Sequence, residues 1–73
     1  MLILGPKQIK AARALAGLTQ LQLGKLAGVS FATVNAIERG RTDPRSSTLR
    51  AIAQALALAG IEINENGGVR PKR

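Results

Sequence analysis

Seventy-three residues, 45% of them hydrophobic, suffice for one small domain near the lower size at which an apolar core alone supports folding. Phe31 is the only aromatic residue, so the core must consist of small aliphatic side chains and leaves little stability to spare. Eleven Lys and Arg stand against four acidic residues, for a net charge of +7. This excess favours a polyanionic partner, most often nucleic acid and sometimes a membrane surface.

The residue types that usually carry catalysis or bind metals are scarce. The chain has no Cys, His or Tyr, and its single Asp, Asp43, falls in an expected loop. We therefore expect no enzyme, no metal, no other cofactor and no small-molecule ligand. The absence of Cys suits a reducing compartment, and no apolar run approaches the length of a membrane span. A cytoplasmic protein without a membrane partner is expected.

Apolar residues at helical spacing predict two helices in the first third of the chain. The first runs from Pro6 to about residue 16 and is ended by Gly17; its inner stripe is Ile9, Ala12, Leu15 and Ala16. The second opens after Thr19, which forms a capping box with Gln22, and its inner stripe is Leu23, Leu26 and Ala27. Gly24 is costly inside this helix, so we expect another helix to approach it closely.

A tight turn joins the second helix to a third. Gly28 can take the left-handed conformation, and Ser30 can cap the next helix, which extends to about Arg39. Val34 and Ile37 are expected to face the core of the domain.

A fourth helix is predicted over residues 46–59, with its buried face formed by Leu49, Ile52, Ala53 and Leu56. Beyond Gly60 the pattern changes: residues 61–63 alternate like a strand, and residues 69–70 can return as a second short strand. We divide the chain into a domain at 1–60 and a C-terminal hairpin with a basic tail at 61–73. Arg70, Lys72 and Arg73 in that tail are interpreted as disordered solubilising charge, with an arm that enters a groove of nucleic acid as the alternative.

Two short helices joined by a glycine turn describe a helix-turn-helix, here over residues 19–39. The stretch T-Q-L-Q-L-G-K-L-A-G-V-S-F-A-T-V-N-A-I-E-R-G-R-T-D-P resembles the Cro/repressor (XRE) type of this motif, and the flanking sequences extend the resemblance over about residues 6–63. The resemblance implies an all-α fold, a compact four-helix, lambda-repressor-like domain, here with a short C-terminal strand or hairpin. It also implies a sequence-specific regulator of transcription, expected to be a repressor, with residues 30–39 in the major groove of double-stranded DNA.

The resemblance also implies roles for individual residues. The positions expected to meet phosphate are Gln20, Ser30, Thr33, Arg39, Arg41 and Arg45, and Ser30 and Thr33 also adjoin the bases. Phe31, Ala32 and Ala36 are expected to face the bases. Arg13 and Glu38 match a pair that bridges the first and third helices in this family, and we interpret both as structural.

The face opposite Val34 and Ile37 is poor in hydrogen-bonding groups. Helical periodicity adds Asn35 to the base-facing residues, beside two alanines that can meet only thymine methyl groups. An alternative therefore stays open, in which the same fold serves as a protein-interaction or antitoxin-like module. We also expect a homodimer, because the core is thin and residues 61–69 alternate in a way that a monomer would struggle to cover.

Overall fold

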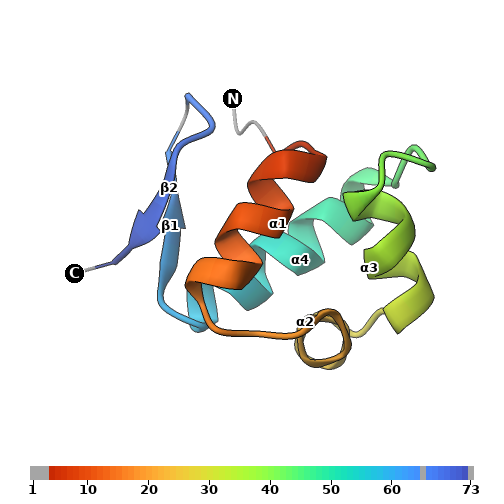
Figure 1. Ribbon diagram of the computed structural model, residues 1–73, viewed down its shortest axis with the longest axis horizontal. Coiled ribbons are helices and arrows are strands. Elements are labelled where there is room, and N and C mark those ends of the chain that lie inside the picture. The colour runs from red at the N-terminus through yellow and green to blue at the C-terminus, as the bar shows by residue number, and fades with distance from the viewer. Residues whose placement is uncertain (1–3, 65, 73) are drawn as a thin grey trace.

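The computed structural model describes residues 4–64 and 66–72, so Arg73 lies outside the described residues. Four helices are followed by a two-stranded antiparallel hairpin: α1 (Pro6–Leu15), α2 (Gln20–Ala27), α3 (Phe31–Glu38), α4 (Ser46–Leu58), β1 (Ile61–Ile63) and β2 (Val69–Pro71). The predicted fold class is therefore confirmed. Figure 1 shows the hairpin at one end of the molecule and α3 at the other, with α1 and α4 between them.

The core is small and aliphatic, as the composition requires. It draws on all four helices and on the first strand: Ile9, Ala12, Leu23, Val34, Ile37, Ile52, Ala55, Leu56 and Ile61. Each of these side chains is at most 4% exposed. Within the described residues, no helix has both the length and the apolar character needed to span a bilayer.

The N-termini of α2 and α3 begin as the sequence predicts. The Thr19 hydroxyl accepts from the Gln22 amide at 3.0 Å, and the Gln22 side chain accepts from the Thr19 amide at 2.9 Å, which completes the capping box. Ser30 caps α3 by accepting from the Thr33 amide at 3.0 Å. These caps fix where the two helices of the motif begin.

Two leucines expected in the core lie at the surface instead. Leu26 is 56% exposed and Leu15 is 47% exposed. In α2 the inward direction is set by Leu23, Gly24 and Ala27, and at about 100° per residue Leu26 points roughly 100° away from the centre of that face. The i, i+3 spacing from Leu23 is therefore not enough to predict that Leu26 is buried.

The C-terminal segment is more ordered than the predicted disordered tail. Glu62 pairs with Arg70 across the hairpin, and their side chains form an ion pair at 2.7 Å. The Lys72 amide donates to the carbonyl of Gly60 at 2.8 Å. In the described part of the tail, Arg70 and Lys72 thus belong to the hairpin, and the prediction of disorder is wrong for both.

The hairpin covers its apolar side with the rest of the chain. Ile61 is 4% exposed, and Ile63 and Val69 are partly buried against the core. The expectation that a monomer would struggle to cover this segment is therefore wrong.

Gly24 is required by a close backbone contact inside the helix-turn-helix. A Cβ atom built at this position would lie 2.7 Å from the carbonyl oxygen of Val29, in the turn between α2 and α3. The close approach expected at Gly24 is therefore real, but it involves the backbone of the turn. Substitution must displace this backbone, because no flexible side chain can yield there.

Gly24→Ala is expected to lower the free energy of unfolding by about 1–3 kcal/mol, the usual cost of overpacking. This loss should appear even though alanine is favoured over glycine inside a helix by about 0.5–1 kcal/mol. Urea unfolding followed by circular dichroism measures the difference. A variant more stable than the wild type would show that the turn relaxes freely.

Candidate nucleic-acid interface

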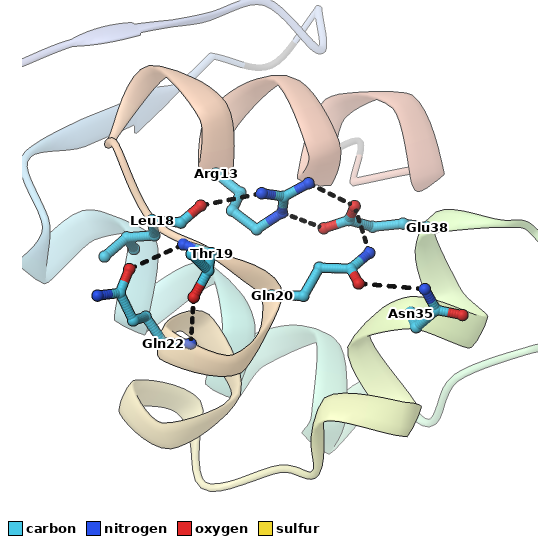
Figure 2. A network of polar contacts seen from close by, with 7 residues as sticks. All are labelled: Arg13, Leu18, Thr19, Gln20, Gln22, Asn35 and Glu38. Atoms are coloured by element: carbon cyan, nitrogen blue, oxygen red, sulfur yellow. Dashed lines mark hydrogen bonds and ion pairs between the residues drawn. The ribbon is translucent and has the colours of Figure 1, made fainter.

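One buried carboxylate ties together the three helices of the first half of the chain. Glu38, the last residue of α3, has a side chain only 3% exposed. Its Oε2 accepts from Arg13 Nε at 2.7 Å, and its Oε1 accepts from Arg13 Nη2 at 3.0 Å. The structure thus contains the pair that the resemblance implies, and this pair joins α1 to α3 in a two-point contact (Figure 2).

Arg13 also fixes the connection between α1 and α2. Its Nη1 donates to the carbonyl of Leu18 at 2.9 Å. The hydrogen bonds to Glu38 hold the pKa of the guanidinium above its ordinary value, against the opposing effect of burial. Because the folded protein favours the protonated form, this stabilisation is fully present at neutral pH and is lost only at strongly alkaline pH.

The same carboxylate continues into a chain of two carboxamides. Gln20 Nε2 donates to Glu38 Oε1 at 3.0 Å, and Gln20 Oε1 accepts from Asn35 Nδ2 at 3.1 Å. Figure 2 shows this chain running from Glu38 on α3 to Gln20 at the start of α2 and back to Asn35 on α3. Neither carboxamide contact is predicted from the sequence, where Gln20 is expected to meet a phosphate and Asn35 to face the bases. Both expectations stay predictions, and the structure adds the bonds that hold the two side chains.

The outward surface of α3 is as apolar as its sequence suggested. Phe31 is 50% exposed and Ala32 is exposed, whereas Ala36 is only partly so. The hydroxyls of Ser30 and Thr33 lie 2.8 Å apart at the start of the helix, where Ser30 also serves as the cap. The predicted base-facing positions therefore offer mainly carbon to a partner.

Positive charge surrounds this apolar surface. Arg39, Arg41 and Arg45 are all exposed and lie between the end of α3 and the start of α4. Arg45 is the residue before α4, and no side chain within the described residues caps that helix. Exposed guanidinium groups beside free helix amides suit the binding of anions such as phosphate.

Comparison with known proteins places this geometry in a family. Residues 9–62 match the family described as helix-turn-helix. Among solved structures, the DNA-binding domain (1–76) of the P22 C2 repressor, determined in solution by nuclear magnetic resonance, is similar. It shares 33% sequence identity and a TM-score of 0.70, over 78% of this chain and 75% of that domain. No curated protein matches the chain.

Glu38→Ala is expected to lower the free energy of unfolding by about 3 kcal/mol or more, because it leaves the largely buried Arg13 charge without its partner. The hairpin supplies a matched control: Glu62 and Arg70 are also 2.7 Å apart, but their side chains are 46% and 71% exposed. Glu62→Ala should change the stability by no more than about 1 kcal/mol. Equal losses in urea unfolding would contradict a special role for the buried pair.

The family match covers most of the chain and includes α2, α3 and α4 in full, with most of α1 and of the first strand. It is not a family of enzymes, which confirms the expectation from the sequence that the protein is not an enzyme. The chain belongs to the helix-turn-helix family of the Cro/repressor type.

Proposed function

We propose that this protein is a cytoplasmic, DNA-binding transcription regulator, a repressor that recognises specific double-stranded sequences. The observation that carries the proposal is the placement of α3, whose exposed start carries Phe31 and Ala32 and whose end is followed by three exposed arginines. An apolar, uncharged helix surface flanked by cations suits the major groove, where bases lie between two phosphate backbones.

The roles divide by chemistry. Arg39, Arg41 and Arg45 supply charge to phosphates and carry most of the affinity, which makes binding sensitive to salt. Phe31 and Ala32 contact thymine methyl groups, a weaker form of recognition. Deformability of the DNA then contributes to the choice of sequence, because few side chains can form hydrogen bonds with bases.

The similarity to the P22 C2 repressor domain supports the proposal, because that protein is described as a repressor with a DNA-binding domain. The two chains share a fold and a third of their residues over most of their lengths. Fold alone would not distinguish a DNA-binding domain from a protein-interaction module. The exposed arginines are what favours DNA here.

The protein should bind duplex DNA, and the logarithm of its affinity should fall with the logarithm of salt concentration by about 0.9 per phosphate contact. Selection from random duplexes should return an enriched motif. Arg41→Ala should weaken binding to all sequences about equally and reduce the salt slope by about one contact.

Ala32→Glu is the sharper test of the groove, because residue 32 is exposed while residue 36 is partly buried. A carboxylate there should abolish binding and leave the melting temperature nearly unchanged. If no duplex binds the wild type even at low salt, a protein-interaction or antitoxin-like role replaces this proposal.

A homodimer on an inverted-repeat site is part of the same proposal. The surface available for it lies where α4 meets the hairpin, in a hollow lined in part by Ala53, Ala57, Ile61 and Ile63. Leu58, at the end of α4, is 87% exposed. A second copy would cover Leu58 and the partly buried Ala53, Ala57 and Ile63.

Sedimentation equilibrium should show a dimer at micromolar concentrations. Leu58→Glu should raise the dissociation constant about tenfold or more, because covering a leucine contributes about 1.5–3 kcal/mol. Leu26→Glu is the matched control, since Leu26 is 56% exposed but lies on α2. A wild-type chain that remains monomeric well above micromolar concentration would contradict the dimer.

A further inference from the structure

The negative charge of Glu38 sets the direction of every hydrogen bond in the carboxamide chain. A carboxylate can only accept hydrogen bonds, so the group that Gln20 turns toward Glu38 must be its NH2. The structure shows this arrangement, with Gln20 Nε2 3.0 Å from Glu38 Oε1. Gln20 cannot reverse its carboxamide without placing an oxygen against a buried anion.

The orientation of Gln20 in turn determines the orientation of Asn35. With its NH2 group turned toward Glu38, Gln20 presents its carbonyl oxygen to Asn35. Asn35 must then approach with its own NH2, and Asn35 Nδ2 lies 3.1 Å from Gln20 Oε1. The Asn35 oxygen is consequently turned away from Gln20, as Figure 2 shows.

An asparagine without such a partner would not have a fixed carboxamide orientation. Its carboxamide can rotate to exchange oxygen and nitrogen, so it can adapt to either a donor or an acceptor on a base. In this chain the rotation of Asn35 would break the bond to Gln20. Partly buried hydrogen bonds of this kind restrict a side chain more strongly than bonds in water do.

We infer that Asn35 reads one base as a fixed hydrogen-bond acceptor, and that Gln20 is the positioning residue that holds it in this state. The base recognised carries an amino group in the major groove, which means adenine (N6) or cytosine (N4), whereas guanine and thymine present oxygen there. The inference rests on the proposed function, because it needs α3 in the groove. It assigns base discrimination on this apolar surface to one side chain and to the buried ion pair behind it.

The test uses the full chain and the duplex motif selected from random DNA, with all four bases placed in turn at each position. The wild type should prefer adenine or cytosine over guanine or thymine about tenfold at one position per half-site. Asn35→Ala should remove that preference and retain those at the other positions. Gln20→Met, whose thioether is only a weak hydrogen-bond acceptor, should reduce the same preference to about twofold or less.

The ratio between bases is the deciding quantity, because Gln20 is also expected to touch phosphate and its loss can lower affinity for every sequence. Arg41→Ala is the control, and it should weaken binding without changing any base ratio. Urea unfolding of each variant checks that the fold survives. The double variant Gln20→Met, Asn35→Ala should show no further change at the position that Asn35 reads.

Three results would overturn the inference, and they can be told apart. If the wild type binds no duplex, the proposed function fails with it. If the wild type binds and selects a motif but Asn35→Ala keeps every base preference, only the role of Asn35 fails. If Asn35→Ala loses a preference that Gln20→Met fully retains, Asn35 reads the base without being positioned by Gln20.

Discussion

The first three helices depend on one carboxylate that is almost out of contact with water. Glu38 accepts hydrogen bonds from two side chains of different helices, and its partner Arg13 reaches on to the carbonyl of Leu18. Transferring such a charge from water is costly unless it is paired and hydrogen-bonded, and here both conditions are met. The pair therefore defines one relative arrangement of α1, α2 and α3, which a thin core of small aliphatic side chains would define less sharply.

Most of the fold could be predicted from the sequence because its signals are local. Capping residues, turn glycines and the spacing of apolar residues lie within a few positions of one another, and Thr19, Gly28 and Ser30 act as expected. Failures arose where the decisive neighbour is distant in sequence. Leu26 has the spacing of a core residue, but none of the described helices and strands packs over it, and Arg70 is held by Glu62, eight residues away.

In the candidate site, too, the contacts that were hard to predict join residues that are distant in sequence. Arg13 and Glu38 are 25 residues apart, and only the resemblance to a known family paired them. Nothing in the sequence linked Gln20 to Asn35. Helical periodicity predicts which way a side chain points from its own helix, but it does not predict where the first turn of α2 lies relative to α3. Asn35 was therefore assigned to the outward face, and its partner on α2 could be found only once the two helices were placed together.

The positions of the acidic residues also favour the binding of DNA. Glu38 is the only acidic residue before Asp43, and its burial against Arg13 removes it from the surface that the first three helices present. The cations that remain in this part of the chain are exposed: Lys7, Lys10, Lys25, Arg39 and Arg41. A phosphate backbone approaching α3 therefore meets mainly positive charge; the nearby exposed carboxylate is Asp43, which lies between Arg41 and Arg45 in the loop after the helix. The same buried anion thus holds the three helices together, leaves only positive charges exposed on them, and orients the carboxamides of Gln20 and Asn35.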